Sequence, residues 1–462
     1  MRKVLLADFL SVYRIEHIVE DNKTYRQVTI SKHDGVSYRG EKLGRNIGRK
    51  RQFIIDLDMH PHTVLFTRQG VIDGSIGLAP VNVNKCIVTE NMPMMSVNTD
   101  VIEIDYFNKL LISDYLLEKI RKLTIVGSAQ KSIHERDFLN IDIELPNKNI
   151  QAMLCTKFKV LDEEHKSLNF ELTYQQSILK NLRQRILQEA IEGKLTAEWR
   201  KENLNIKPAS EILTLIFAEK TKLINDKKIK KGEKQASNEL QSNALSVPSG
   251  WEYPDLDDIC KYITDGTHQT PNYKPSGRIF LSAQNVKPFR FMPENHKYVS
   301  EEDYQQYIKN TKVEKGDILL GRVGAGIGEA AVVDVDIECA IYVSLGLIKT
   351  FQEFTDPKYL EIVFNSPYGV AYSKGNISSG GGSAGNFNLG RIRAFPIPLP
   401  SLSEQKAIVA QVKKLILLCN QLETQIINNQ THSEQLMQVV LKEAFSQGDK
   451  MFSVSESETI YA

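Results

Sequence analysis

A glycine-rich stretch contains the first residues whose spacing could do chemistry. Gly324, Gly326 and Gly328 alternate with other residues, as in the loops that cradle a dinucleotide or S-adenosylmethionine. Such a cofactor loop opens a helix, whereas the residues that follow here, from Ala330 to Asp334, favour a strand. We therefore expect a tight turn at these glycines and no cofactor bound by this chain.

Other signatures of catalysis are missing from the sequence. It has no phosphate-loop lysine motif, no histidine pair at metal-ligand spacing on a helix, and no proline-aromatic motif with which amino-methyltransferases hold an extruded base. The cysteines are odd in number, scattered and without metal-ligand spacing, so we expect free thiols in a reducing cytoplasm. They are Cys86, Cys155, Cys260, Cys339 and Cys419. We expect neither a catalytic centre nor a metal site.

Recognition chemistry remains, in polar loops of the second half. Gln and Asn side chains can bond adenine bidentately, and Arg can do the same with guanine. For each residue the alternative is an ordinary loop side chain that caps its own turn, so the set is more informative than any member. The candidate DNA-binding residues of this half are Thr267, His268, Gln269, Thr270, Asn272, Tyr273, Gln284, Asn285, Arg322, Asn386 and Asn388.

Basic residues supply the candidates of the first half. A glycine-rich loop with Glu41 as its only acid holds Arg39, Lys42, Arg45, Arg49, Lys50 and Arg51, and Arg68 follows a predicted strand. Basic loops can neutralise DNA phosphates, although a solvated surface loop is the alternative. The whole chain has 58 basic and 57 acidic residues and a net charge of +1, so overall charge neither supports nor opposes a nucleic-acid partner.

Two long helices must position these loops. Apolar residues recur in steps of four and three along two stretches, which predicts a pair of coiled-coil helices. The first seam is Leu154, Phe158, Leu161, Leu168, Leu172, Leu179, Leu182 and Ile186; the second is Ile408, Val412, Leu415, Leu422, Ile426, Leu436 and Val440, with Cys419 between. Polar Gln175 and Asn429 interrupt the seams, either to fix the helix register or as simple exceptions in the core.

The two seams stand 254 residues apart, and other features keep that offset. Leu145-Pro146 precedes the first helix as Leu399-Pro400 precedes the second, and Arg68 corresponds to Arg322. The chain is therefore a tandem pseudo-repeat of about 254 residues. We predict an α+β protein with two mixed α/β domains separated by two long antiparallel coiled-coil helices.

The predicted boundaries follow from this repeat and from shifts in composition. Residues 1–146 form a first recognition domain, 147–200 the first long helix, 201–250 a helix and a Lys-rich linker, 251–400 a second recognition domain, 401–448 the second long helix and 449–462 a tail. No apolar run is long enough to span a membrane, and we expect a cytoplasmic protein.

The motifs resemble those of one known family. Asp265-Gly266-Thr267-His268 with Thr270-Pro271, the Gly316 to Leu319 segment with Gly326-Ile327-Gly328, and Ile397 to Pro400 followed by Ser403-Glu404-Gln405 are similar to the specificity subunit of type I restriction-modification enzymes. The resemblance is strong in the second half. In the first half Glu144-Leu145-Pro146 replaces the double-proline element.

This resemblance implies a non-catalytic subunit that recognises a bipartite, asymmetric DNA site, with each globular half reading one part and the helices fixing the gap. It implies two methyltransferase subunits, which carry S-adenosylmethionine and methylate adenine, and restriction/translocase subunits that use ATP and Mg. The rival hypothesis is a coiled-coil scaffold that joins two protein-binding modules without DNA readout. A third, a methyltransferase or nuclease, is disfavoured by the missing catalytic motifs.

Overall fold

The computed structural model of the chain describes residues 2–123, 132–230, 232–234, 245–378 and 385–447. It divides into two compact units: unit 1 comprises residues 1–174 and 426–462, and unit 2 comprises residues 175–425. Each unit therefore contains one globular domain and parts of both long helices. The predicted tail, and residues 231 and 235–244 of the Lys-rich linker, lie outside the described residues.

Unit 1 contains a sheet in the order β2-β10-β7-β8, whose neighbouring strands all run antiparallel. These strands are β2 (Leu10–Tyr13), β10 (Met94–Val97), β7 (Thr63–Phe66) and β8 (Ile76–Leu78). A second sheet has the order β3-β6-β9-β4-β5. Its strands are β3 (Glu16–Ile18), β6 (Arg51–Ile54), β9 (Ile87–Val88), β4 (Thr24–Ser31) and β5 (Gly35–Leu43), while β1 (Arg2–Leu5) pairs with β11 (Asp142–Leu145).

Short helices complete unit 1. They are α1 (Ile104–Leu111), α2 (Asp114–Lys122) and α3 (Glu135–Leu139). The apolar and charged residues from 104 to 122 form two helices, because Ser113 separates α1 from α2. The Ser113 side chain accepts a hydrogen bond from the amide of Leu116 and so caps the start of α2.

Unit 2 repeats the first of these sheets. Its strands follow the order β12-β20-β17-β18, again with antiparallel neighbours. They are β12 (Cys260–Asp265), β20 (Leu345–Thr350), β17 (Ile318–Gly321) and β18 (Ala330–Val332). A repeated sheet order and strand direction agree with the pseudo-repeat inferred from the sequence, while the remaining strands differ between the units.

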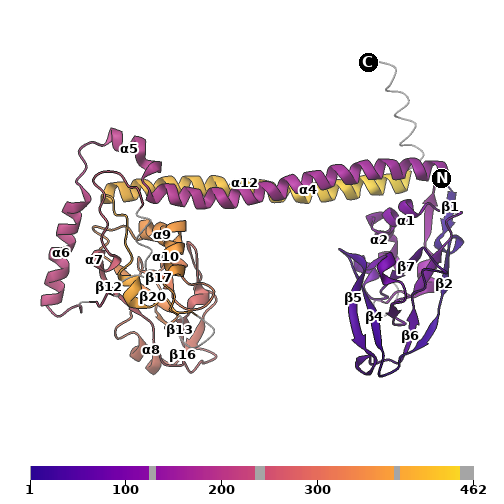
Figure 1. The fold of residues 1–462 in the computed structure, drawn as a ribbon, viewed down its shortest axis with the longest axis horizontal. Helices are drawn as coiled ribbons and strands as arrows, with labels where there is room; N and C mark the ends of the chain where they lie inside the picture. The colour runs from indigo at the N-terminus through magenta and orange to yellow at the C-terminus, as the bar shows by residue number, and fades with distance from the viewer. Residues whose placement is uncertain (1, 124–131, 231, 235–244, 379–384, 448–462) are drawn as a thin grey trace, which may run out of the picture. The chain divides into compact units, whose positions relative to one another are not determined.

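Unit 2 contains two further small sheets and seven α-helices outside the long pair among the described residues (Figure 1). The strands β16 (Lys297–Val299), β13 (Arg278–Leu281) and β19 (Cys339–Ile341) form one small sheet, and β14 (Val286–Lys287) pairs with β15 (Arg290–Phe291). The helices are α5 (Ala197–Glu202), α6 (Ala209–Asn225), α7 (Leu256–Ile259), α8 (Glu301–Tyr307), α9 (Pro357–Asn365), α10 (Pro367–Gly375) and α11 (Leu389–Arg393).

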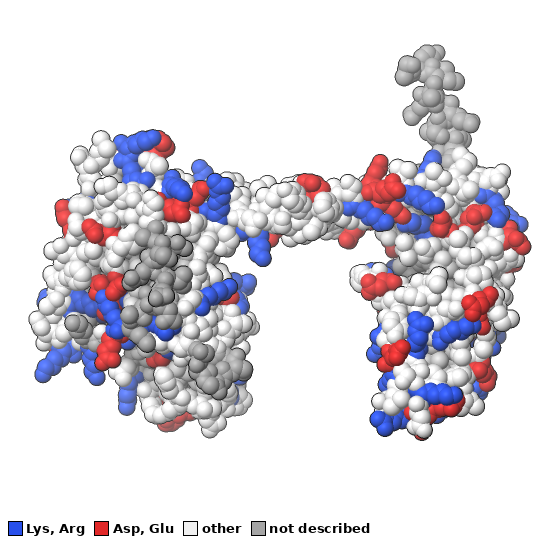
Figure 2. Space-filling model, in the orientation of Figure 1, with Lys and Arg blue, Asp and Glu red and all other residues white. Residues whose placement is uncertain are grey.

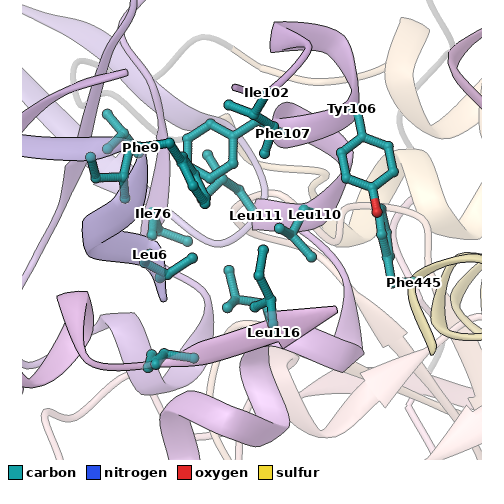
Figure 3. Packing of buried hydrophobic residues seen from close by; sticks show 14 of the residues in the cluster. Leu6, Phe9, Ile76, Ile102, Tyr106, Phe107, Leu110, Leu111, Leu116 and Phe445 are labelled. Atoms are coloured by element: carbon teal, nitrogen blue, oxygen red, sulfur yellow. The ribbon is translucent and has the colours of Figure 1, made fainter. Parts of the chain in front are cut away.

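The core of unit 1 includes the end of the chain's last helix. Phe445 is fully buried and lies edge-on to Tyr106, with ring centroids 5.1 Å apart (Figure 3). Leu441 and Ala444 join the same cluster, together with Leu154 and Phe158 of the first long helix. Segments from both ends of the sequence therefore stabilise one hydrophobic core.

The long helices are α4 (Lys148–Ile191) and α12 (Leu402–Gln447). In unit 1 the start of α4 lies beside the end of α12, since Leu154 and Val440 line one cavity. In unit 2 Arg183 of α4 donates to the carboxylate of Glu423 at 2.8 Å. The helices therefore run antiparallel in each unit, as predicted (Figure 1). Gly193, with φ 69°, follows the last turn of α4 and is suited to ending it.

The predicted seam is correct in part. Buried seam residues are Leu154, Phe158, Leu172, Leu179, Ile186, Ile408, Val412, Cys419 and Ile426, and Leu161, Leu415 and Val440 are partly buried. Leu168, Leu182, Leu422 and Leu436 are 40–62% exposed, so their assignment to the seam was wrong. Asn429 is exposed too and cannot act as a buried register residue. Two helices shield only one narrow stripe of each other, and these positions lie outside it.

Candidate nucleic-acid interface

The polar loop of unit 2 begins where strand β12 ends. Gly266 lies so close to the neighbouring chain that a Cβ atom built there would be 2.1 Å from the carbonyl oxygen of Ile341. The next residue, Thr267, receives a hydrogen bond at its carbonyl from the amide of Val343 and donates its own amide to Ile341. Only glycine fits this approach. The glycine of the Asp-Gly-Thr-His motif is therefore explained by the way the loop is tied to the sheet.

Most of the candidate DNA-binding residues of unit 2 are accessible to solvent. His268, Gln269, Thr270, Asn272, Tyr273, Gln284 and Asn386 are exposed, and Thr267 is partly buried. The Tyr273 ring is braced from one side, because the ammonium of Lys297 lies 4.1 Å from its centroid. These side chains can present hydrogen-bonding groups and an aromatic ring to a nucleic acid.

Arg322 has a different place from the one predicted for a DNA-reading side chain. It is buried, at 4% exposure, and its guanidinium donates to the carboxylate of Asp265 and to the carbonyl oxygens of Phe387 (3.1 Å) and Val343 (3.2 Å). Burial lowers the pKa of Arg322, and the charge of Asp265 opposes that shift. A guanidinium that is already satisfied inside the protein does not read bases, so this prediction was wrong.

Two asparagines also have structural roles. Asn285 is fully buried; its side chain accepts from the amide of Ser282 and donates to the carbonyls of Met292 (3.0 Å) and Asn295 (2.8 Å). It holds its own loop closed, and its assignment as a DNA contact was wrong. Asn388 caps α11 by accepting a hydrogen bond from the amide of Arg391.

The basic cluster of unit 1 was predicted to be a loop, but part of it is a strand. Arg39 and Lys42 lie on β5, exposed, beside a bulge at Gly40 with φ 121°. Arg45 and Arg49 are exposed on the connection to β6. These four cations form the basic surface of unit 1 and have the exposure that phosphate contacts need.

The last two cations of the cluster already have acidic partners. Lys50 pairs with Asp21 at 2.5 Å, and Arg51 pairs with Glu16. With Arg14, Arg49, Phe53 and Glu90 they line a cavity of about 300 Å³. On the face drawn in Figure 2, basic and acidic side chains are interspersed over both units, so neither carries a uniformly basic face there.

Arg68 is withdrawn from the surface, so its assignment as a DNA contact was also wrong. Its side chain is 14% exposed and donates to both carboxylate oxygens of Glu135, at 3.0 and 2.9 Å. Arg14 donates to the same carboxylate at 2.8 Å. Burial raises the pKa of Glu135, but hydrogen bonds from the backbone, Arg14 and Arg68 outweigh it and lower that pKa below its usual range. The sequence does not reveal the pairing of Arg14 with Glu135, because the two residues are 121 positions apart and meet only in the folded unit.

The glycine motif is a turn, as predicted. Gly324 and Gly328 both have φ 87°, and the amide of Gly328 donates to the carbonyl of Gly321 ahead of strand β18. The cysteines are free and buried. Among the described residues no group of His, Cys, Asp and Glu side chains could hold a metal ion. Within the same residues, no helix has the length and apolarity to cross a membrane.

Comparison with known proteins agrees with this arrangement. Residues 248–430 match the model for the type I restriction modification DNA specificity domain. The chain is 28% identical over 279 residues to the EcoAI specificity subunit of Escherichia coli, covering 57% of this chain and 44% of that protein. It is 26% identical over 318 residues to the EcoBI specificity subunit of the same organism, covering 68% of this chain and 60% of that protein. The chain thus spans less than half the length of the first of these relatives.

Solved structures share the fold. A chain from a type I R-M system has a TM-score of 0.61 at 17% identity, and the match covers 96% of this chain and 97% of that one. The HsdS subunit from Thermoanaerobacter tengcongensis has a TM-score of 0.50 at 18% identity, covering 96% of both chains. At these identities the likeness concerns the fold alone.

Proposed function

We propose that this chain, whose residues 248–430 belong to the type I restriction modification DNA specificity family, is the non-catalytic subunit that selects the DNA site of a type I restriction-modification complex. Unit 1 and unit 2 each read one part of a bipartite, asymmetric sequence. One observation supports this proposal above the others: a single sheet order recurs in both units, while the exposed side chains around it differ. A repeated frame with divergent loops suits the reading of two unlike sequences.

DNA readout is divided between two kinds of surface in this proposal. In unit 2 the polar side chains from His268 to Tyr273, with Gln284 and Asn386, reach base edges. In unit 1 the cations Arg39, Lys42, Arg45 and Arg49 contact phosphates and so position the duplex, while other exposed side chains of the same unit read its bases. The chain works in the cytoplasm, where its buried free thiols stay reduced.

Two methyltransferase subunits dock on the long helices. The exposed leucines recur at the repeat distance, Leu168 with Leu422 and Leu182 with Leu436, so each copy of the repeat offers the same apolar positions. Apolar positions left uncovered on a helix pair suit packing against further helices. The methyltransferase subunits carry S-adenosylmethionine and methylate adenine, and restriction/translocase subunits, which use ATP and Mg, join them.

Co-expression of this chain with the methyltransferase subunit of the same restriction-modification system tests this function. The complex is produced in a host without DNA methylation, and methylated adenines are mapped across the genome. The proposal predicts one two-part motif with a fixed gap. A complex that forms but methylates no defined motif would contradict it and favour the scaffold hypothesis.

A further inference from the structure

Each unit has an arginine withdrawn from the surface at the same place in the repeated sheet. Arg68 follows β7 and Arg322 follows β17. The amide of Arg68 donates to the carbonyl of Asn91 at 3.0 Å, and that of Arg322 to Ser344 at 2.9 Å. The Arg68 carbonyl accepts from the amide of Ile133 at 2.8 Å, and the Arg322 carbonyl accepts from Phe387 at 2.9 Å. The backbone surroundings of the two arginines are therefore equivalent.

The carboxylate that neutralises each arginine comes from a different element. In unit 2 it is Asp265, at the end of β12. In unit 1 it is Glu135, the first residue of α3. The equivalent first residue of α11 in unit 2 is Leu389, which has no charge.

Strand register shows what occupies the place of Asp265 in unit 1. Tyr13 pairs with Met94, which pairs with Leu65, three residues before Arg68. Likewise Thr264 pairs with Leu347, which pairs with Leu319, three residues before Arg322. Arg14 follows Tyr13 as Asp265 follows Thr264.

Unit 1 thus has a cation where unit 2 has an anion. Two guanidiniums that face each other repel, and Glu135 bridges them, with its oxygens 2.8–3.0 Å from Arg14 and Arg68. The two units hold equivalent arginines by alternative placements of one carboxylate.

In unit 2 this arginine joins the segments that carry the exposed polar residues. Asp265 opens the loop of His268, which lies 3.1 Å from the same carboxylate. Phe387 stands between Asn386 and Asn388, and Val343 donates its amide to Thr267. Removing the guanidinium releases contacts to all three segments together, while the strands keep their ladder hydrogen bonds.

We infer that Arg322 is a positioning residue, which holds the DNA-reading segments of unit 2 through a buried ion pair, and that Arg68, with equivalent backbone partners, holds the segments of Asn91 and Ile133 in unit 1. The inference rests on the proposed function and adds to it the residues that set the accuracy of each half-site. Neither arginine touches DNA; each acts through the loops that it ties together.

The test compares methylated motifs. Arg322→Gln removes the charge and keeps much of the side-chain volume. We expect discrimination at the second half of the motif, measured as the ratio of methylation at matched and singly mismatched sites, to fall about tenfold or more. The first half and the gap stay unchanged, and Arg68→Gln has the mirror-image effect. A merely structural role would lower methylation everywhere without changing the motif.

Lys349→Gln is the matched control. Lys349 belongs to unit 2 and forms a buried ion pair with Asp317 at 2.6 Å, at the opposite end of β20 from the loop residues. Its loss should reduce stability and leave the motif intact. The inference is overturned if Arg322→Gln keeps full discrimination, or if Lys349→Gln alters the motif equally.

A rescue variant copies the arrangement of unit 1 into unit 2. Asp265→Arg alone places two guanidiniums together and should lose the second half of the motif. Adding Leu389→Glu supplies the bridging carboxylate. Discrimination should then return to within about threefold of the wild-type value, a margin similar to the error with which mutational free energies add. If the double variant discriminates no better than Asp265→Arg, the inference is contradicted. This comparison replaces the Arg322→Gln experiment if Arg322→Gln abolishes all methylation. A wild-type complex without a two-part motif would overturn the proposed function itself, and the inference with it.

Discussion

Gln151 and Gln405 make the same hydrogen bonds in the two units. The Gln151 side chain accepts from the amide of Glu103 (2.7 Å) and donates to the carbonyl of Pro146 (2.8 Å). The Gln405 side chain accepts from Asp356 (2.8 Å) and donates to Pro400 (3.0 Å). Both glutamines are fully buried in the first turns of α4 and α12. Each long helix is thereby fixed to the globular domain that precedes it.

Replacing either glutamine should destabilise its own unit. Gln405→Ala leaves the Asp356 amide and the Pro400 carbonyl unpaired inside the protein, and Gln151→Ala does the same in unit 1. We expect each variant to lower the free energy of unfolding by about 2–4 kcal/mol in urea denaturation. Gln411→Ala, at an exposed position of α12, serves as the control and should change it by less than about 0.5 kcal/mol. Equal effects at positions 405 and 411 would contradict this role.

Phe445 should contribute strongly to unit 1. Phe445→Ala leaves a cavity beside Tyr106 and Phe158, which should cost about 3–5 kcal/mol of unfolding free energy. Leu436→Ala removes an apolar side chain that is 62% exposed on the same helix and should cost much less. Urea denaturation of the two variants makes the comparison. Similar losses would show that the end of α12 does not complete the core.

Acid should weaken the Glu135 bridge. The pKa of Glu135 is lowered in the folded protein, so its carboxylate stabilises unit 1 above the unfolded value of about 4.3. That stabilisation is lost as the pH falls through the folded value. Measured by urea denaturation, the stability gap between wild type and Glu135→Gln should therefore be largest near neutral pH and shrink below about pH 4. A gap that stays constant from pH 7 to pH 3 would exclude this linkage.

The exposed leucines should determine how many methyltransferase subunits bind. Leu168→Glu and Leu422→Glu place a charge at equivalent docking positions, and burying an unpaired charge is costly. Native mass spectrometry should show one bound methyltransferase subunit in place of two for each variant. Ser167→Glu and Gln421→Glu add the same charge at adjacent exposed positions and should retain both copies. Loss of binding in these controls would point to a general effect of charge.

Phosphate contacts in unit 1 should appear as a change in salt dependence. Arg39→Ala or Lys42→Ala should weaken DNA binding by the complex to a similar extent for matched and mismatched sites. Each should also reduce the slope of log affinity against log salt concentration by about 0.9. Lys85→Ala removes a cation already paired with Asp56 and Asp58, both at 2.8 Å, and should leave the slope unchanged. An unchanged slope for both Arg39→Ala and Lys42→Ala would place the phosphates elsewhere.

The repeat and the helices could be predicted because they depend on local periodicity. The strand predicted just before Arg68 is β7, and the equivalent strand before Arg322 is β17. Both long helices have their expected extent to within about ten residues. A heptad pattern, however, does not say how much of a helix its partner covers, which is why Leu168 and Leu422 were wrongly placed in the seam.

The roles of individual polar residues could not be predicted in the same way. The sequence around an arginine that follows a strand does not distinguish a side chain that contacts DNA from one that pairs with a carboxylate inside the protein. Arg68 and Arg322 were assigned to DNA because neither Glu135 nor Asp265 is near them in sequence. Asn285 was misassigned for the same reason, since its carbonyl partners at Met292 and Asn295 depend on how the loop closes. By contrast, His268 and Gln269 are exposed, as residues that contact DNA must be.

Exchange of one recognition segment tests the central claim most directly. Residues 1–146 are replaced by the corresponding segment of a relative with a different site, and the methylated motif of the complex is mapped. If each unit reads its own part, one half of the motif changes to that of the donor, while the other half is retained. A motif that changes in both halves, or in neither, would contradict the assignment of one half-site to each unit.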